Sequence, residues 1–549
     1  MSTNEPLPPA ESLNPAKAPD PMQPEPRDEA ITAKLQSALE IMEAVAENRR
    51  LLAHLGDEGR KRLMIAAGKV FSPDRADRRR LVKEFGRLRK NSKLDRDENV
   101  FNETGIRRLR KQPVFTTPNI LPPAAFTPND VSQPPETLAE QSLPPALHEQ
   151  NCYICKKYYS QVHHFYDQLC PACADFNFFK RTELADLTGR VALLTGGRVK
   201  IGYQAGLKLL RCGAHLIVTT RFPRDSAARY AREPDFEQWG HRLEIFGLDL
   251  RHTPSVEGFC RVMLQTRERL DFIVNNACQT VRRPPEFYEH MMEGETAALG
   301  TMPAELRKLL GSYEGLRGYH LLPEGADASA DALADASAAA GVVPVLPGLT
   351  HAAELSQVRL LPEEQEAQKA LFPQGRLDQD LQQVDLRSRN SWRMLMAEVP
   401  AVELLEVQLV NAVAPFLLNA RLKPLMLKTA ERDKHIVNVS AVEGQFYRRS
   451  KTTRHPHTNM AKAALNMMTR TAATDYQQDG IHMNSVDTGW VTDEDPAEIA
   501  ERKVLEHRFH PPLDIVDGAA RIVDPIITGV KSGQHVWGQF LKDYQPTDW

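Results

Sequence analysis

Four cysteines are spaced in a way that could bind one metal ion. They form two Cys-x-x-Cys pairs, Cys152–Cys155 and Cys170–Cys173, with 14 residues between the pairs. Each pair can turn two thiolates toward the same ion, and four thiolates complete the tetrahedral site that zinc prefers. Because such a site leaves no coordination position open, we expect a structural zinc ion. His163 and His164 lie between the pairs and could replace one cysteine, although a surface position is the simpler interpretation.

A glycine-rich turn forms the second group of candidate residues. An apolar run over 191–194 ends at this turn, and a helical pattern of leucines opens directly behind it. Glycines in such a turn let backbone N–H groups and a helix N-terminus approach a pyrophosphate closely. A second strand pattern over 216–220 completes a β-α-β unit, which favours nucleotide binding over an ordinary loop. The residues expected to contact the nucleotide here are Thr195, Gly196, Gly197, Arg198, Lys200, Ile201 and Gly202.

The charges around this turn favour NADP(H) over NAD(H). An acidic residue at the end of the second strand would bind the ribose 2′-hydroxyl of NAD. Here the strand instead ends in Thr219-Thr220-Arg221, and the turn itself holds Arg198 and Lys200. Cations suit a 2′-phosphate, because a guanidinium can bind it through two charge-assisted hydrogen bonds. The alternative is that Arg198 and Lys200 only point into solvent.

A parallel sheet would bring these residues to one place. Further strand patterns over 243–248, 271–274 and 435–439 alternate with helical runs. This alternation is typical of an α/β fold with a doubly wound parallel sheet of Rossmann type, whose strand ends meet at one edge. Because the first strand pattern follows soon after the second cysteine pair, the cysteine module is expected to cap the entrance of the sheet. Contact with a partner is its alternative role.

Taken in order, the strand ends resemble the short-chain dehydrogenase/reductase family over residues 186–549. Thr195-Gly196-Gly197 with Ile201-Gly202 is similar to the first turn of that family, and Asn275-Asn276-Ala277-Cys278 to its Asn-Asn-Ala-Gly segment. The later matching segments are Asp249-Leu250, Val410-Asn411, Val437–Ser440, Lys462–Leu465, Asn484–Val491 and, as the last strand, Trp537–Asp543. The resemblance implies cofactor contacts at Asp249, Leu250, Asn276, Ala277, Lys462 and Gly489. Lys200 departs from the pattern, since the family usually has glycine there.

The resemblance also implies a catalytic set of Asn, Ser, Tyr and Lys, of which this chain keeps a part. Asn411 and Lys462 match, whereas Thr458 occupies the tyrosine position and Ala441 the serine position. A threonine hydroxyl does not ionise near neutral pH, so it cannot replace a phenol as general acid. His457 is the first candidate for the proton donor, because imidazole titrates at about 6.5. Further candidates are His455, Tyr447 and Ser440, and a loop role beside Pro456 is the alternative for both histidines.

Composition divides the chain into five parts. Residues 1–27 are proline-rich and predicted to be disordered, 28–112 form a basic helical region, 113–146 a proline-rich linker, 147–180 the cysteine module and 186–549 the dehydrogenase-like domain. A basic helical face is usually solvated, and contact with nucleic acid or an acidic protein is the alternative. An insertion at about 280–400, with an Ala-, Asp- and Ser-rich stretch near 326–340, begins where substrate would enter. We expect it to be a lid, a partner surface or a surface elaboration.

Overall composition excludes few classes of partner. The chain has 42% hydrophobic and 26% charged residues and a net charge of −3. We expect no apolar run as long as the ~20 residues that span a bilayer. The sequence therefore predicts a cytoplasmic protein without a membrane segment. Cys212, Cys260 and Cys278 lie within apolar patterns and are expected to be reduced core thiols.

These residues together predict an NADP(H)-dependent oxidoreductase that transfers hydride to or from a small carbonyl or alcohol. The expected partners are a small-molecule substrate, further copies of the chain and a protein bound through the N-terminal region. Nucleic acid is not expected. The alternative function is an NADP(H)-binding sensor or scaffold that acts through protein interaction, which would suit the missing tyrosine.

Overall fold

The computed structural model describes residues 26–115, 117, 143–310, 351–365, 368–447, 451–492 and 494–549. The described residues belong to two compact units, Met1–Ser92 and Lys93–Trp549. Most of the segment predicted to be disordered, most of the proline-rich linker and the Ala-rich stretch of the insertion lie outside the described residues.

The second unit is built on an eight-stranded sheet. Its strand order is β10-β9-β8-β7-β6-β3-β4-β5, and all pairs are parallel except β9 with β10. This confirms the predicted doubly wound sheet of Rossmann type. The strands are β3 (Val191–Thr195), β4 (His215–Thr220), β5 (Leu243–Gly247), β6 (Phe272–Asn275), β7 (Lys434–Ser440), β8 (Ile481–Asp487), β9 (Phe540–Lys542) and β10 (Gln545–Thr547).

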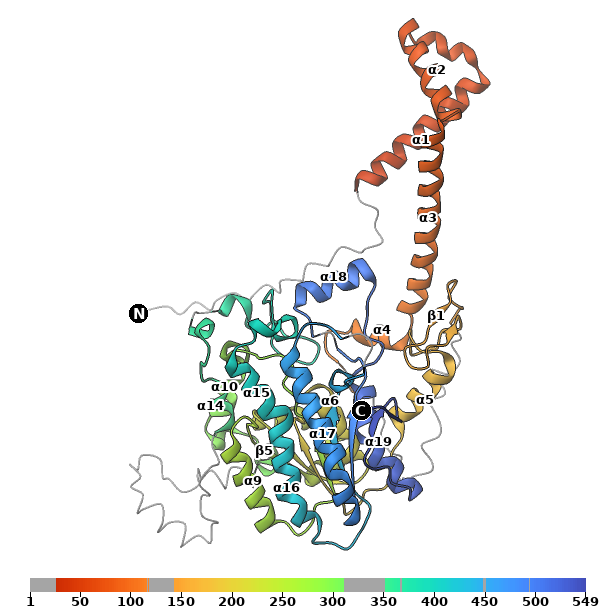
Figure 1. The fold of residues 1–549 in the computed structure, drawn as a ribbon. Coiled ribbons are helices and arrows are strands. Elements are labelled where there is room, and N and C mark those ends of the chain that lie inside the picture. The colour runs from red at the N-terminus through yellow and green to blue at the C-terminus, as the bar shows by residue number, and fades with distance from the viewer. Residues whose placement is uncertain are drawn as a thin grey trace, which may run out of the picture. The chain divides into compact units, whose positions relative to one another are not determined.

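Helices cover both faces of this sheet (Figure 1). Successive strand residues point to opposite faces, so Leu194 packs in one hydrophobic cluster and Leu193 in another. The Leu194 cluster includes α6 (Lys200–Arg211) and α19 (Ile515–Ser532). The Leu193 cluster includes α9 (Thr253–Thr266), α16 (Ala414–Met426) and α17 (Pro456–Gln478). Two separate cores therefore hold the sheet rigid from both sides.

The remaining helices connect these elements. They are α4 (Gly105–Arg110), α5 (Pro171–Thr182), α7 (Pro223–Tyr230), α8 (Phe236–Trp239), α10 (Pro285–Thr296), α11 (Ala304–Leu309), α14 (Ala352–Leu355), α15 (Ala401–Gln408) and α18 (Ala497–His507). Short 3₁₀ turns lie at Arg49–His54, Gly240–Arg242, Leu299–Thr301, Pro362–Gln365, Lys369–Leu371, Ser391–Arg393, Met396–Glu398 and Val442–Gly444.

One continuous helix is longer and more apolar than the sequence indicated. A π-helical turn over Leu409–Val413 joins α15 to α16. The resulting helix, Ala401–Met426, contains an 18-residue window with a mean hydropathy of 1.6, so it is long and apolar enough to cross a membrane by length and composition alone. The sequence reading missed this run because Glu403 and Glu406 interrupt it. Leu418 and Leu422 of this helix pack into the core against the sheet, as expected of a core helix.

The described part of the insertion packs beside the C-terminal edge of the sheet. Its core joins Phe287, Tyr288 and Met291 of α10 to Ala353 of α14 and to Phe372. Phe222, which follows β4, belongs to the same cluster. The insertion is therefore anchored to the nucleotide-binding half of the sheet, an arrangement that the sequence did not reveal.

The cysteine module is small and lies against the same unit. It contains the two-residue strands β1 (Gln150–Asn151) and β2 (Tyr158–Tyr159), which pair antiparallel, and it leads into α5. Its core includes Cys152, Tyr166 and Leu169 together with Leu513 and Val516 from the end of the chain. This packing agrees with the expectation that the module contacts the sheet domain.

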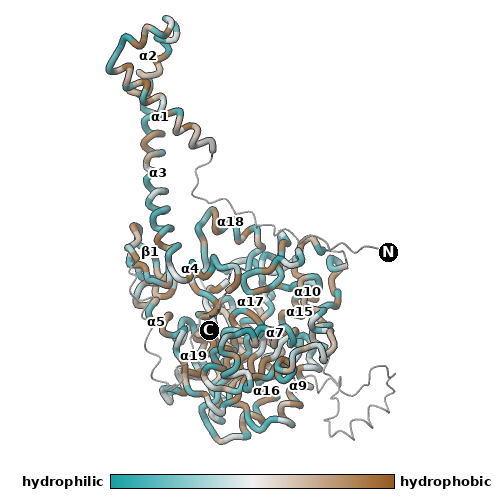
Figure 2. Tube along the Cα trace, turned by 180° about the vertical axis from the view of Figure 1, so that it is seen from behind, coloured by the Kyte–Doolittle hydropathy of each residue, from teal (hydrophilic) through white to brown (hydrophobic). Residues whose placement is uncertain are grey.

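The first unit consists of helices. They are α1 (Pro26–Glu47), α2 (Asp57–Phe71) and the first part of α3 (Arg75–Asn102). None of the residues in α2 is buried, and Arg78, Arg79 and Arg80 in α3 are exposed. Figure 2 shows mostly hydrophilic residues along α3. The exposed basic face stays compatible with the solvated interpretation.

The packing of α6 on α7 can be tested at Gly206. A Cβ on Gly206 would lie 2.3 Å from the Tyr230 hydroxyl, which donates a 2.8 Å hydrogen bond to the Gly197 carbonyl. We expect Gly206→Ala to lower the free energy of unfolding by about 1–3 kcal/mol, because the phenol must leave its place. The control is Gly294→Ala in α10, where nothing lies within 4 Å of the added carbon. Urea unfolding of both variants makes the comparison, and equal stability would contradict it.

Candidate functional site

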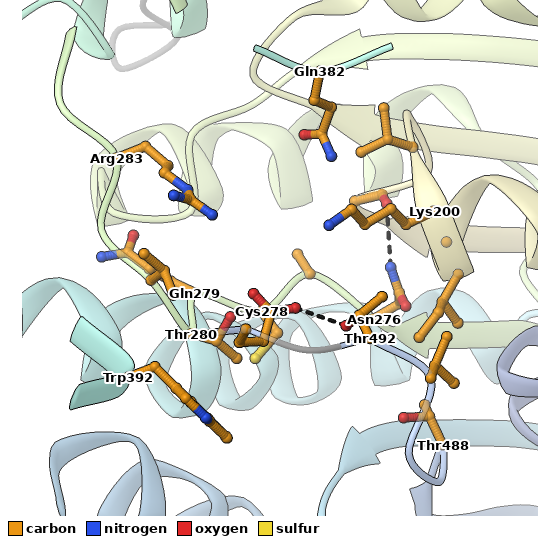
Figure 3. Close-up of a pocket in the computed structure, with 18 of the residues that line it drawn as sticks. Lys200, Asn276, Cys278, Gln279, Thr280, Arg283, Gln382, Trp392, Thr488 and Thr492 are labelled. Carbon is orange, nitrogen blue, oxygen red and sulfur yellow. Dashed lines mark hydrogen bonds between the residues drawn. The ribbon is translucent and has the colours of Figure 1, made fainter. Parts of the chain in front are cut away.

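A large cavity opens at the C-terminal edge of the parallel strands. Its volume is about 1150 Å³. The wall combines the glycine-rich turn, the ends of β4 to β8, and residues of the insertion such as Asp378, Gln382 and Trp392 (Figure 3). It extends from Arg221 to Lys462, so the cavity joins the two groups of residues that the sequence analysis singled out.

The glycine-rich turn fits closely against the end of β6. A Cβ on Gly196, whose φ is +70°, would lie 2.9 Å from the Ala277 Cα atom, and one on Gly202 would lie 2.2 Å from the Gly196 carbonyl oxygen. The Asn276 amide donates to the carbonyls of Thr195 and Gly196, both at 3.1 Å. Only glycine suits these two positions, and the turn therefore presents bare backbone and the start of α6 to the cavity.

Lys200 stands in this turn with φ of +54°, a left-handed conformation that glycine normally adopts. Its ammonium extends into the cavity, opposite Arg283 (Figure 3). Burial opposes its charge, but Glu494, Asp380 and Asp378 outweigh burial and raise the pKa of Lys200. The ammonium thus faces carboxylates as well as the space that a ligand would fill, instead of pointing into bulk solvent.

The three cations proposed for a 2′-phosphate differ in their surroundings. Arg198 is buried and donates to Asp225 at 2.6 Å, so its charge is already neutralised. Arg221 lines the cavity and donates to the Tyr288 hydroxyl at 2.6 Å, and its guanidinium carbon lies 4.5 Å from the centre of that ring. A phenol leaves the charge of Arg221 in place. Arg221 is therefore the better placed cation for a phosphate.

Asp249 and Leu250, for which the resemblance implies cofactor contacts, line the cavity. The Asp249 carboxylate, however, accepts bonds from the Arg251 guanidinium, the shortest at 2.6 Å. Burial raises its pKa, but Arg251 outweighs that effect and lowers the pKa of Asp249 overall. Arg251 also pairs with Glu406 of α15 at 3.0 Å. This ion-pair network was missed, because Glu406 is distant in the sequence.

Lys462 marks the other end of the cavity. Its ammonium donates to the Val439 carbonyl at 2.8 Å, and Ser440 and Ala441 lie beside it in the wall. The Ser440 hydroxyl donates to the side-chain amide oxygen (Oδ1) of Asn466 at 2.6 Å. Gly489 also lines the cavity. Lys462 and Gly489 thus line the same cavity, and their contacts with a cofactor stay a prediction.

Three other predicted catalytic residues lie behind this wall. Asn411 sits in the π-helical turn, where its amide accepts from the Gln279 N–H at 2.8 Å and donates to the Gln279 carbonyl at 3.0 Å. The Thr458 hydroxyl is buried without a hydrogen-bond partner in the described part of the chain. The His457 ring is 1% exposed and lies 3.4 Å from the Glu403 carboxylate in α15. None of the three is among the described residues that line the cavity.

The other proposed proton donors also have defined places. His455 precedes α17 and stacks on Trp392, with ring centres 3.8 Å apart, so it reaches the cavity only through that indole. Tyr447 is 89% exposed. Cys212 and Cys260 are buried thiols as predicted, but the prediction was wrong for Cys278, which is exposed. The reason is that Cys278 follows the end of β6 and enters the cavity wall.

Asp487 is a functional candidate that the sequence analysis missed. It ends β8 opposite Ser440 and lines the cavity. Its carboxylate accepts from the Val442 N–H at 3.1 Å and the Gly489 N–H at 3.2 Å. Burial raises the pKa of Asp487 to about 6, although the ammonium of Lys542 opposes this. The sequence did contain a signal for it, because Asp487 lies two residues before Gly489, where the resemblance implies a cofactor contact.

The four cysteines come together as their spacing predicted. The sulfur atoms of Cys152, Cys155, Cys170 and Cys173 all lie within 4.8 Å of one another. Such a set of four thiols has the composition and the separation of a tetrahedral metal site. His163 instead accepts from the Phe165 N–H at 3.0 Å and lies 3.3 Å from Asp175, so its ring serves the fold of the loop.

Several known proteins are similar to this chain. A family model described as enoyl-(acyl carrier protein) reductase matches residues 387–512. An uncharacterized protein of Acanthamoeba polyphaga mimivirus is 28% identical over 402 residues, which cover 71% of this chain and 74% of that protein. Dehydrogenase/reductase SDR family member 13 of Bos taurus is 32% identical over 105 residues, which cover 18% of this chain and only 28% of the bovine protein.

Among solved structures, the chain matches a complex of Pseudomonas aeruginosa RhlG with NADP at 15% identity and a TM-score of 0.38. That match covers 65% of this chain and 95% of RhlG. A metagenomic short-chain oxidoreductase in complex with NADP has 17% identity and a TM-score of 0.36. That match covers 66% of this chain and 100% of the oxidoreductase.

The burial of Asp487 predicts a pH-dependent stability. Its folded-state pKa of about 6 lies above the ordinary 3.8, so ionisation of the carboxylate weakens the fold as pH rises from about 4 through 6. At pH 7.5, we expect the free energy of unfolding of Asp487→Asn to exceed that of the wild type by on the order of 1 to 3 kcal/mol. This advantage should vanish near pH 4.

Urea unfolding at both pH values measures the effect. The control is Glu237→Gln, an exposed carboxylate on α8, which should follow the wild type at each pH. An advantage of Asp487→Asn that does not change with pH would contradict the raised pKa.

Proposed function

Since the chain belongs to the short-chain dehydrogenase/reductase family of NAD(P)-dependent oxidoreductases, we propose that it is an NADP(H)-dependent reductase of small carbonyl compounds. One observation carries this proposal. A single cavity joins the glycine turn, with its bare backbone, and Arg221 to the ammonium of Lys462 and the carboxyl group of Asp487. It therefore supplies a place for phosphates at one end and proton-transfer chemistry at the other.

The residues present fit a phosphorylated dinucleotide. Gly196 and Gly202 leave a cradle that any Cβ would fill. β4 ends at Thr220, and the residue that follows it is Arg221 instead of a carboxylate. Arg221 would bind the 2′-phosphate, which distinguishes NADP(H) from NAD(H). Lys462, held by the Val439 carbonyl, would bind the nicotinamide-side ribose, as the family resemblance implies.

When bound, NADPH supplies the hydride for the carbonyl carbon. Asp487 would supply the proton for the carbonyl oxygen, because its buried carboxyl group holds a proton up to a pH of about 6 and faces the cavity. Asp487 is favoured over His457, whose ring faces Glu403. Asn411 is favoured as a positioning residue, since its amide holds the Gln279 backbone that continues into the cavity wall.

A zinc ion in the four-cysteine cluster is part of the proposal. Four thiolates are soft ligands and leave no open position, so the ion would be structural. Cysteine pairs in small modules commonly depend on such an ion for folding. Stoichiometric zinc in the purified protein is the expected finding.

Cofactor choice can be tested at Arg221. We expect Arg221→Ala to raise the dissociation constant for NADPH about 10- to 100-fold, because one charge-assisted phosphate contact is lost. Binding of NADH should change by less than about twofold. Arg232→Ala, at an exposed arginine after α7, is the control. Fluorescence titration measures both cofactors, and equal losses for NADPH and NADH would show that Arg221 does not bind the 2′-phosphate.

Turnover can be tested with a panel of aldehydes and ketones, followed by the loss of NADPH absorbance. Reduction should slow as pH rises above about 6, because the donor must be protonated. Asp487→Asn should lower kcat about 100-fold or more and leave NADPH binding unchanged. If His457→Gln has that effect instead, His457 is the donor. Tight NADPH binding without turnover of any compound would identify the sensor or scaffold.

A further inference from the structure

The four-cysteine cluster borders the dinucleotide cavity through one residue of its own first knuckle. Tyr153 stands between the ligands Cys152 and Cys155, and its side chain lines the same cavity as the glycine turn and Lys462. Its backbone N–H donates to the Gln168 carbonyl at 2.9 Å, which fixes the knuckle to the loop before the second cysteine pair. The knuckle that would hold the metal therefore also forms part of the cavity wall.

Tyr153 contacts the segment that follows β8. The Trp490 N–H donates to the Tyr153 hydroxyl at 3.0 Å. Gly489 lies directly before Trp490, and a Cβ at Gly489 would be 3.7 Å from the same hydroxyl. Since the Tyr153 oxygen accepts this bond, its own proton remains to be donated to an oxygen of a bound ligand. Tyr153 thus has the place and the chemistry of a binding residue.

The metal ligands and the nucleotide turn also share one hydrophobic core. Cys152, Cys170 and Cys173 pack in the same cluster as Ile201 of the glycine-rich turn and Val491 of the segment after β8. A displacement of the cysteines would therefore also displace Ile201 and Val491, because a densely packed core transmits displacement.

Polar contacts tie the module to the start of α19. The Gln168 amide donates to the His510 carbonyl at 2.8 Å. Arg181 donates to Asp514 at 2.6 Å, and the Tyr166 hydroxyl donates to Asp517. These bonds are buried or half-buried, so the module is a fixed part of the wall and not a separate appendage.

Before α5, which begins at Pro171, the module has little regular secondary structure with which to hold the first knuckle in place. Its two strands are two residues long each, and an isolated hairpin is marginal in water even when longer. A metal ion bound by four thiolates would supply the missing constraint, because its binding free energy becomes folding free energy.

We propose that the metal held by Cys152, Cys155, Cys170 and Cys173 positions Tyr153 and the Gly489–Val491 segment for dinucleotide binding. Metal and dinucleotide then stabilise each other, since coupling between two ligands is reciprocal. Tyr153 is a cofactor-binding residue supplied by the metal module. The inference rests on the proposed NADP(H) binding and adds a second ligand that controls it.

The first experiment measures the coupling on the full chain. NADPH is titrated by fluorescence into the zinc-replete protein, into protein stripped by a chelator, and into stripped protein after zinc is returned. We expect removal to weaken NADPH binding about tenfold and zinc to restore it. In the reciprocal direction, NADPH should slow the transfer of zinc to a colorimetric chelator by a similar factor.

The second experiment keeps the metal in place. Tyr153→Phe removes one hydroxyl without removing a cysteine, and we expect it to retain one zinc ion per chain and to bind NADPH about three- to tenfold more weakly. The matched control is Tyr158→Phe, at a 71% exposed tyrosine of β2 in the same module. It should retain both zinc and NADPH affinity.

The outcomes separate this inference from the proposed function. If NADPH binds the zinc-replete protein, but neither stripping nor Tyr153→Phe changes its affinity, the coupling is wrong and the proposed function stands. Purified protein without zinc that binds NADPH would overturn the coupling in the same way. If removal of zinc unfolds the chain, two other measurements test the coupling. They are the NADPH affinity of Tyr153→Phe and the rate at which zinc passes to the chelator in the presence of NADPH. If the zinc-replete protein binds no NADPH, both proposals fail.

Discussion

The close approach of the glycine-rich turn to the end of β6 is the constraint on which the site depends. Gly196 and Gly202 leave space for no Cβ against Ala277 and the Gly196 carbonyl. The Asn276 amide bridges the two carbonyls of the turn. This contact fixes where α6 begins, and with it which backbone groups face the cavity. It also explains why Lys200 is held with a positive φ, since the turn must close there whatever the residue is.

The sequence was sufficient for the sheet and for the residues that the strand ends carry. Apolar runs over 191–194 and 216–220 became β3 and β4 within one residue of their expected limits. Because parallel strands end at a common edge, Gly196 after β3 and Asn276 after β6 had to converge, whereas Lys462 lies on α17 and was placed by the family resemblance. The four cysteines could be grouped for a similar reason, since short Cys-x-x-Cys loops restrict where two sulfur atoms can go.

What the sequence could not show depends on tertiary neighbours. Arg198 looked free for a phosphate, but α7 brings Asp225 to it. His457 looked free for proton transfer, but α15 places Glu403 beside it. The position of α15 could not be predicted, because it follows an insertion whose fold the sequence does not indicate. Asp487 was not recognised as a candidate from the sequence, because its raised pKa results from burial. Tyr153 could not be assigned, since nothing in its knuckle indicates which surface it meets.

The position of the insertion in the sheet order has a consequence for the independence of sheet and insertion. The strand order turns at β3, with β4 on one side and β6 on the other, so the crevice lies between connections that leave in opposite directions. The extra segment enters immediately after β6 and leaves through α15, and every strand pairing is preserved around it. This segment can therefore differ in length or sequence while the ladder of the sheet keeps its register, because no strand pairing that the structure describes in the sheet depends on it.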